Sequence, residues 1–416
     1  MNVQVYWRGP VGKVSGLGIA SKEYVRALAR QGVRVKLAQK TGKIASGNKR
    51  RTGGKGTSVL IYHFPPNRIN IKKERKKYDY LILNTVWETT RIPRNWFPAI
   101  NRFDAVCVPS KQNKRALINS GVKVPIFIVP HGVNTRTFHP ANRKLFIKDA
   151  KGRFVFVSVF GFQHRKNPET LLRAYWNAFT SKDKVLLAIK TFGYRKHETQ
   201  QWIHNQIRRY RLKLGYRKSL PPITLLPRYL SFKQIPQLYT RGNVFVLPTR
   251  GEGVGLPFLE ALASGIPVIA TGWGGHMDFL TKSNSFLIPY KLLPPAKSMN
   301  NKHVIARTFR GLFVQRGQLW AEVTSPALSQ LMKKAYKNPA LCKKKGKQGR
   351  RDMLKHSWNR SGLAMKRAIL QVVKRRVVKR SLSLGVVTHV NDQLEKQLSA
   401  VGAVRKFGPE SSNPTT

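Results

Sequence analysis

Short apolar runs alternate with amphipathic stretches of helical periodicity from the first residues of the chain to about residue 340. Val3–Trp7 has the composition of a strand, and Tyr24, Ala27 and Leu28 recur on one face of a predicted helix over residues 19–30. Single strands alternating with single helices predict a parallel α/β sheet. We expect further strands at residues 33–37, 58–63, 80–84, 105–109, 126–129, 153–159, 185–191, 223–226, 244–248 and 267–270, and further helices at 111–120, 169–179, 232–239 and 257–264.

An irregular segment, residues 130–143, interrupts the alternation and is rich in Pro, Gly, Asn and His. The 416 residues exceed the size at which a single core keeps growing, so two similar domains are expected on either side of this segment. Residues 343–380 carry fifteen Lys and Arg and one acid, which predicts basic helices. The expected organisation is an N-terminal Rossmann-like domain at 1–140, a C-terminal one at 141–340, a basic helical segment at 341–380 that packs back on the body, and a partly disordered tail at 381–416.

Charge is the unusual feature of the composition, with 78 Lys and Arg against 17 Asp and Glu and a formal net charge of +61. A field of this sign attracts nucleic acid, anionic lipid headgroups or acidic polymers. A host proteome that is basic throughout, or an acidic or saline cell interior, would give the same composition. Because acids are so few, an acid placed between glycines is informative.

The two cysteines are too few for a disulfide framework or for a zinc site of three or four thiolates. The first residues alternate like a strand and carry no basic leader before an apolar run, which argues against a signal peptide. No stretch reaches the roughly 18 apolar residues that a transmembrane helix needs. These features predict a cytoplasmic protein in a reducing setting, which could still bind a membrane surface peripherally.

Candidate chemistry lies where the predicted strand 244–248 runs into a loop with glycines at 251, 253 and 255. Pro257 stands at the expected first position of the next helix, where its missing N–H costs nothing. The free N–H groups at this helix end, from about Gly255 to Leu259, and the helix dipole predict an anion site. Glycines allow a phosphate to approach the backbone closely.

Two acids flank this predicted anion site. Glu260 lies about one turn into the helix, where its carboxylate can accept hydrogen bonds from a ribose diol beyond the phosphates. Glu252 precedes the helix on the other side of the site. The pair would therefore bracket a bound diphosphate, one acid towards the nucleoside and the other towards a sugar.

Glu252 and Glu260, spaced as E-x7-E within EGVGLPFLEALASGIPVIAT, resemble the hallmark of retaining GT-B glycosyltransferases of family 4. Arg165-Lys166-Asn167 is similar to the family's RKG, whose lysine contacts the donor diphosphate. The resemblance covers most of residues 1–340. Further similar segments are the glycine loop Ser15–Gly18, Trp87–Pro93, the inter-domain hinge Val129–Asn134, Gly274–Asp278 and, with a structural role only, Trp320–Glu322.

The resemblance implies an α/β GT-B fold with two Rossmann-like domains facing across a cleft. It implies transfer of a hexose from a nucleoside-diphosphate sugar to a hydroxyl of a glycan, lipid-linked or protein acceptor, with retention of anomeric configuration. Glu252 and Lys166 are the implied catalytic residues. The implied donor-binding residues are Gly16, Gly18, Arg165, Gly253, Val254, Gly255, Leu256 and Glu260.

The chain departs from the family pattern at two places. Phe160-Gly161-Phe162 stands where the family often has an arginine, and Trp87-Glu88 stands where many relatives have a histidine near the anomeric centre. His63 is an alternative to that histidine, and a structural role for it is equally open. No Asp-x-Asp motif occurs, so we expect no metal and no cofactor besides the sugar donor.

Two other function classes are alternatives to sugar transfer. A non-enzymatic polyanion-binding or membrane-binding protein would explain the charge but not the glutamate pair with its glycines. A Rossmann oxidoreductase is disfavoured because Lys36–Lys40, at the end of the second strand, contains no acid for a ribose hydroxyl. The expected partners are a nucleotide-sugar donor and a hydroxyl acceptor. For the basic segment, the candidate partners are an anionic membrane surface or an acidic glycan, and the alternative is that the segment is simply a solvated basic surface. Nucleic acid is not expected as a specific partner.

Overall fold

The computed structural model describes residues 2–38, 56–216, 219–226 and 229–383. Residues 39–55, between the predicted strands at 33–37 and 58–63, lie outside the described residues, and so does most of the predicted tail. Residues 1–369 form one compact unit, and residues from 370 onward are grouped separately. No described helix is both long enough and apolar enough to cross a membrane.

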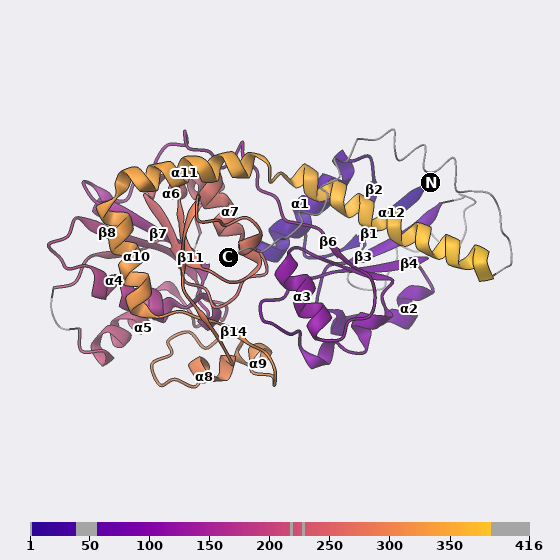
Figure 1. The fold of residues 1–416 in the computed structure, drawn as a ribbon, viewed down its shortest axis with the longest axis horizontal. Helices are drawn as coiled ribbons and strands as arrows, with labels where there is room; N and C mark the ends of the chain where they lie inside the picture. Colours follow the sequence, from indigo (N-terminus) through magenta and orange to yellow (C-terminus); the bar gives the residue numbers. More distant parts are fainter. Residues whose placement is uncertain (1, 39–55, 217–218, 227–228, 384–416) are drawn as a thin grey trace, which may run out of the picture. The chain divides into compact units, whose positions relative to one another are not determined.

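The first half of the compact unit contains a parallel six-stranded sheet in the order β2-β1-β3-β4-β5-β6 (Figure 1). Its strands read as apolar runs because a parallel sheet is covered on both faces, and β4 is buried at all five positions. The strands are β1 (Val3–Arg8), β2 (Arg34–Leu37), β3 (Thr57–Tyr62), β4 (Tyr80–Asn84), β5 (Ala105–Val108) and β6 (Ile126–Ile128), and the helices are α1 (Gly16–Arg30), α2 (Ile71–Arg75) and α3 (Lys111–Asn119).

The second half contains another parallel six-stranded sheet, in the order β12-β11-β10-β7-β8-β9. Its central strand β7 (Phe154–Gly161) pairs with β8 on one side and β10 on the other, and seven of its eight residues are buried. The remaining strands are β8 (Val185–Phe192), β9 (Ile223–Leu226), β10 (Val244–Leu247), β11 (Val268–Thr271) and β12 (Ser285–Ile288), and the helices are α4 (Pro168–Ala178), α5 (Gln200–Lys213), α6 (Gln234–Arg241), α7 (Leu256–Ala263), α10 (Ser325–Lys337) and α11 (Pro339–Leu354).

An antiparallel pair of short strands interrupts the second half after β12. It consists of β13 (Lys291–Leu293) and β14 (Trp320–Glu322), with α8 (Pro295–Met299) and α9 (Arg310–Phe313) between them. Met299, Phe313 and Trp320 from this excursion belong to the apolar cluster of the first sheet, where the Phe313 and Trp87 rings lie 5.3 Å apart. This part of the chain therefore packs on the N-terminal half although it follows the second sheet in sequence.

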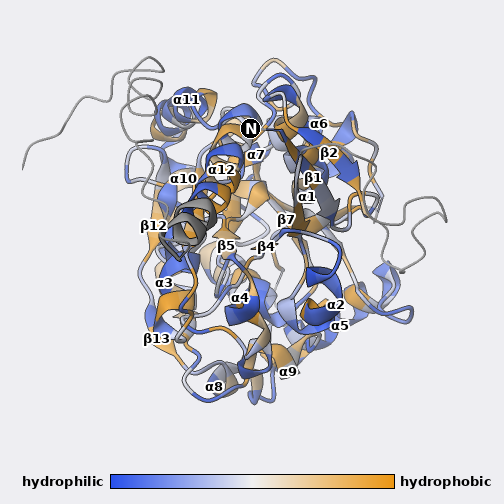
Figure 2. Ribbon diagram, turned by 90° about the vertical axis from the view of Figure 1, so that its right-hand side faces the viewer, coloured by the Kyte–Doolittle hydropathy of each residue, from blue (hydrophilic) through white to orange (hydrophobic). Residues whose placement is uncertain are grey.

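Every predicted strand and helix is present, with ends that agree within about two residues, except that the first helix begins three residues earlier than predicted. The sequence pattern did not predict α2, α5, α10, β12 or the excursion between β13 and β14. Figure 2 shows hydrophobic residues along strands such as β7 and β12 and mixed faces on surface helices such as α11. The missed α5 has a weak apolar face, with Ile203 and Tyr210 as its only buried residues.

The basic segment after residue 338 is helical. Helix α11 packs on α7 so closely that a Cβ on Gly346 would lie 2.1 Å from the Gly265 carbonyl oxygen. Helix α12 (Trp358–Ser383) begins against α1, where a Cβ on Gly362 would lie 2.6 Å from the Ala27 carbonyl oxygen. Small residues thus bring both basic helices into backbone contact with the α/β unit.

Candidate functional site

The loop between β10 and α7 carries a row of backbone N–H groups without acceptors. Helix α7 begins at Leu256, one residue before the predicted start, and Gly255 precedes it with φ +83° and no side-chain cap. Among the described residues, the N–H groups of Gly253, Val254, Gly255 and Leu256 have no hydrogen-bond acceptor. The Phe258 N–H, in contrast, bonds to the Gly255 carbonyl oxygen at 3.0 Å. The free donors therefore lie slightly earlier in the chain than predicted.

Two buried cations face this loop from the end of β7. Arg165 and Lys166 are 8% and 9% exposed, and Asn167 after them has a left-handed φ of +59°, which turns the chain into α4. The Asn167 side chain caps that helix by accepting from the Thr170 N–H at 3.3 Å. The Asn167 turn is thus the local feature that places both cations at the carboxyl edge of the second sheet.

Glu252 joins the loop to these cations. The Lys166 ammonium donates to Glu252 Oε1, and the Arg165 guanidinium lies 3.3 Å from Glu252 Oε2. Arg165 also donates to the Gly251 carbonyl oxygen. The structure therefore brings together three of the residues that the sequence singled out.

Electrostatics keep Glu252 ionised. Burial alone would raise the pKa of its carboxyl, but Lys166 and Arg165 outweigh burial and hold that pKa at about 2. Burial lowers the pKa of the Lys166 ammonium, and Glu252 opposes this shift. At neutral pH Glu252 can accept hydrogen bonds from hydroxyl groups, but it has no proton to donate.

Glu88 also belongs to this cluster, although the sequence reading gave it no role. It follows β4, and its Oε1 lies 3.3 Å from the Arg165 guanidinium. Burial raises the pKa of the Glu88 carboxyl, and Arg165 partly offsets that rise. The available signal was position, because Glu88, Arg165 and Glu252 all follow the carboxyl ends of parallel strands, where ligands bind in open α/β sheets.

The structure gives a reason for the glycines of the β10–α7 loop other than the predicted approach of a phosphate. A Cβ on Gly251 would lie 2.1 Å from the Glu88 carbonyl oxygen, and one on Gly253 would lie 1.9 Å from Val86 Cγ2. Gly255 needs its positive φ to begin the helix. Close packing of the loop on residues 86–88 and the turn at Gly255 therefore account for these glycines.

Glu260 lies in α7 and is held by a tyrosine that the sequence reading missed. The Tyr239 hydroxyl, from α6, donates to Glu260 Oε2 at 2.6 Å. Burial raises the pKa of the Glu260 carboxyl to about 7, although the hydrogen bond from Tyr239 lowers it. The residue as a whole is of intermediate exposure, and its only side-chain hydrogen bond among the described residues is the one from Tyr239 to Oε2.

Gly16 and Gly18 were expected in a loop, but both lie in the first turn of α1. Open space surrounds Gly16, whereas a Cβ on Gly18 would lie 2.0 Å from the Lys13 carbonyl oxygen. The Ser15 hydroxyl caps this helix by accepting from the Gly18 N–H at 3.1 Å. Within the described residues, no hydrogen bond or ion pair joins these glycines to Glu252 or Lys166.

The position where relatives carry an arginine is covered by an aromatic ring. A Cβ on Gly161 would lie 2.1 Å from the Tyr194 hydroxyl, which accepts a hydrogen bond from Gln163 Nε2 at 3.0 Å. Burial raises the pKa of Tyr194 to about 12. The cations next to Glu252 are therefore Arg165 and Lys166, and an uncharged phenol lies over Gly161.

His63 is buried among aromatic side chains of the N-terminal half. Its ring packs edge-on against Trp7, with ring centres 5.4 Å apart, and it also contacts Tyr24. Burial, with a further contribution from His131, lowers the pKa of His63 to about 3. A neutral imidazole enclosed by aromatic rings is a packing element of the first sheet.

A second buried ion network joins the β10–α7 loop to the Trp320–Glu322 segment. The Arg250 Nε donates to Glu322 Oε1 at 2.7 Å, and Trp320 Nε1 donates to the same oxygen at 2.8 Å. The Ala321 N–H bonds to the Arg250 carbonyl oxygen at 2.8 Å. The Trp320–Glu322 segment thus fixes the residue two positions before Glu252 and acts structurally.

Comparison with known proteins shows a resemblance that is concentrated in the middle of the chain. Residues 151–296 match the family model described as "Glycosyl transferases group 1". The lipopolysaccharide core biosynthesis mannosyltransferase LpsB of Rhizobium meliloti (strain 1021) is 28% identical over 198 residues, which cover 44% of this chain and 49% of that protein. A sucrose synthase of Melioribacter roseus is 28% identical over 145 residues, which cover 35% of this chain and 17% of that protein. The chain thus spans about half the length of LpsB and less of the sucrose synthase.

Solved structures agree with the two-sheet architecture over nearly the whole chain. Sucrose-phosphate synthase from Thermosynechococcus elongatus superposes with a TM-score of 0.62 at 16% identity, covering 90% of this chain and 100% of that one. Anabaena Alr3699/HepE in complex with UDP and glucose gives 0.60 at 11% identity, covering 88% and 99%. The predicted α/β fold with two Rossmann-like domains of GT-B type is therefore confirmed.

Proposed function

Because residues 151–296 match the family model of the glycosyl transferases group 1, we propose that this protein transfers a hexose from a nucleoside-diphosphate sugar to a hydroxyl acceptor. One observation carries the proposal. The free N–H groups of Gly253–Leu256 open beside the buried cluster of Glu252, Lys166 and Arg165. Such an arrangement suits a doubly charged diphosphate that leaves as the sugar departs.

The diphosphate would bind at the amino end of α7. Its oxygens accept from the free N–H groups, and the helix dipole adds to the attraction. Negative charge grows on the leaving diphosphate as the glycosidic bond breaks, so fixed donors stabilise the transition state more than the ground state. Lys166 and Arg165 lie at the same loop and supply the compensating positive charge.

Glu252 would orient the sugar. Its carboxylate is ionised at neutral pH, so it accepts hydrogen bonds from sugar hydroxyls and does not act as a general acid. In keeping with the family resemblance, we propose same-face transfer assisted by the leaving phosphate and hence retention of anomeric configuration. Glu260 would accept from the ribose hydroxyls, with Tyr239 fixing the orientation of its carboxyl.

The proposed reaction needs no metal ion. Backbone N–H groups and two buried cations provide the charge compensation that a metal-bound diphosphate would otherwise require. Besides the nucleoside-diphosphate sugar and the acceptor, the proposed reaction would need no cofactor. Full transfer activity in the presence of EDTA is the expected result, and activity that returns only when a divalent cation is added would refute metal independence.

The acceptor class is inferred from a relative and from the net charge. LpsB is named for lipopolysaccharide core synthesis, which is in keeping with a glycan or lipid-linked hydroxyl acceptor for this chain. The net charge of +61 favours an acceptor presented on an anionic membrane surface or on an acidic glycan. A role in binding alone is disfavoured because it leaves the Glu252 and Lys166 pair without a purpose.

A donor screen tests the proposal. Purified protein is mixed with UDP-, GDP- and ADP-hexoses, and its thermal unfolding is followed for each. We expect one nucleotide family to raise the melting temperature and to be hydrolysed slowly without acceptor, with release of the nucleoside diphosphate. If no nucleoside-diphosphate sugar shifts the transition or is turned over, the proposal is wrong.

A further inference from the structure

Helix α11 presents a cluster of exposed cations. Lys343, Lys344, Lys347 and Arg351 are all exposed. Within the part of the chain that the structure describes, none of the four makes an ion pair with a carboxylate. Asp352, the single acid of residues 343–380, instead accepts hydrogen bonds from Asn284 and Gln348, both at 2.8 Å.

The other charged side chains of α11 hold the helix in place. Lys345 donates to the Ser285 carbonyl oxygen at 3.1 Å, and Arg350 donates to the carbonyl oxygens of Thr135 and Phe138 at 3.0 and 2.9 Å. The opposite face of the helix is buried through Cys342, Gly346, Gly349 and Met353. The four unpaired cations therefore project from a firmly packed helix.

Three of the four cations lie on one face. Lys343, Lys347 and Arg351 follow each other at intervals of four residues, which places them in a row along the helix, with about 6 Å of axial rise per step. Leu354 continues this face three residues after Arg351 and is 56% exposed. The face thus combines a row of positive charges with one exposed apolar side chain.

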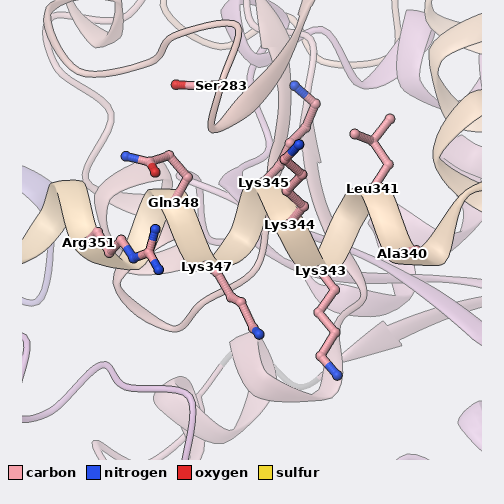
Figure 3. Close-up of a pocket in the computed structure, with 9 residues that line it drawn as sticks. All are labelled: Ser283, Ala340, Leu341, Lys343, Lys344, Lys345, Lys347, Gln348 and Arg351. Atoms are coloured by element: carbon pink, nitrogen blue, oxygen red, sulfur yellow. The ribbon is translucent and has the colours of Figure 1, made fainter.

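A cavity of 670 Å³ lies against this helix, between its basic side chains and the loop of Ser283 (Figure 3). In the close-up, Lys343 and Lys347 extend in the same direction, while Lys344 and Gln348 extend from the other side of the helix, where Ser283 lies. Ammonium, amide and hydroxyl groups together suit the oxygens of a phosphate ester. Burial and the nearby Lys334 and Lys344 lower the pKa of Lys345, which shows how closely the cations are crowded.

We propose that this face of α11 docks the protein on an anionic lipid bilayer, with a phosphate headgroup in the cavity and Leu354 at the headgroup boundary. An apolar side chain within a basic helix face is typical of interfacial helices, whereas a soluble polyanion has no use for it. Residues 339–354 contain no aromatic side chain on which nucleic acid bases could stack. This docking surface is separate from the donor loop and does not depend on the proposed sugar transfer.

Vesicle sedimentation with the full chain tests the proposal. Binding is compared on phosphatidylcholine vesicles with and without roughly one third phosphatidylglycerol, and a basic residue near such a surface contributes on the order of fivefold in affinity. The triple variant Lys343→Gln, Lys347→Gln, Arg351→Gln is expected to bind anionic vesicles on the order of 100-fold more weakly. Equal binding by this variant and the wild type would overturn the proposal.

A charge-matched variant on α5 is the control. Arg208→Gln, Arg209→Gln and Arg211→Gln remove the same charge from another exposed helix, and we expect less than about a threefold loss. An equal loss in this control would mean that total charge, and not the α11 face, governs binding, which would also overturn the proposal. Both variants leave buried contacts intact, and their thermal unfolding is measured to establish that they fold.

Leu354→Ser separates a bilayer from a soluble polyanion. The change leaves the charge as it is and removes the apolar side chain, so vesicle binding is expected to fall by about fivefold, whereas heparin binding stays the same. Heparin binding that depends on α11 without any preference for anionic vesicles would assign the face to a soluble polyanion and refute the lipid proposal. Nucleoside-diphosphate sugars should shift the melting temperature of all these variants equally, so failure of the docking proposal is distinguishable from failure of the proposed sugar transfer.

Discussion

Two strand–loop–helix units of this protein both have glycine-rich loops but differ in their chemistry. The unit after β1 leads through Gly9, Gly12 and Gly16 into α1, and the unit after β10 leads through three glycines into α7. At α1 the Ser15 hydroxyl accepts a hydrogen bond from the Gly18 N–H. At α7 Gly255 provides no such cap, and four consecutive N–H groups have no acceptor among the described residues. An open helix end next to buried cations, and not glycine content, distinguishes a candidate anion site.

The largest expected effect comes from Glu252→Gln, which leaves buried Lys166 without a carboxylate and Arg165 with Glu88 alone. We expect unfolding free energy to fall by about 3 kcal/mol and turnover to fall at least about 100-fold, with a smaller change in donor affinity. Denaturant unfolding and a transfer assay measure the two effects. The double variant Glu252→Gln with Lys166→Met should recover stability without recovering turnover. Wild-type turnover in the single variant would remove Glu252 from the reaction.

A carboxylate placed at each helix start tests the comparison directly. Leu256 and Gly16 are the first residues of α7 and α1. Leu256→Asp should weaken donor binding by roughly tenfold or more, because a like charge would lie beside the diphosphate. Gly16→Asp, which enters open space, should leave donor affinity unchanged. Calorimetric titration checks both, and an equal loss in the two variants would restore Gly16 to the donor site.

The pH dependence of donor binding tests Glu260. Its pKa of about 7 means that the carboxyl is largely protonated at pH 6 and ionised at pH 8. The ionised form accepts from two ribose hydroxyls, so wild-type donor affinity should rise across this interval by several-fold. Glu260→Gln should bind about tenfold more weakly at pH 8 and show no such rise. A pH dependence that persists in the variant would assign it to another group.

The smallest expected effect is that of Ser15→Ala. Loss of this N-cap should lower the free energy of unfolding by about 1 kcal/mol without any change in donor affinity. Thermal unfolding and titration with the donor provide the two measurements. A loss of donor affinity without a loss of stability would mean that Ser15 serves the ligand and not the helix, which would remove the contrast between the two units.

The sequence alone determined the two α/β series, because alternation of apolar runs with amphipathic helices reflects burial of both faces of each parallel sheet. It also determined the E-x7-E loop, whose residues are contiguous in the chain. It did not reveal α5, whose apolar face is weak, or the excursion between β13 and β14, whose aromatic residues pack on the distant first sheet.

Only the tertiary structure decided which side chains meet. Glu88 reaches Arg165 across 77 positions of the chain, and Tyr239 holds Glu260 from another helix. The sequence pattern encodes the periodicity of each element. The packing of one loop on another determines which side chains form ion pairs and which backbone N–H groups lack an acceptor. For this reason the sequence could not show that Gly251 and Gly253, interpreted as space for a phosphate, also leave space for residues 86–88 of the protein itself.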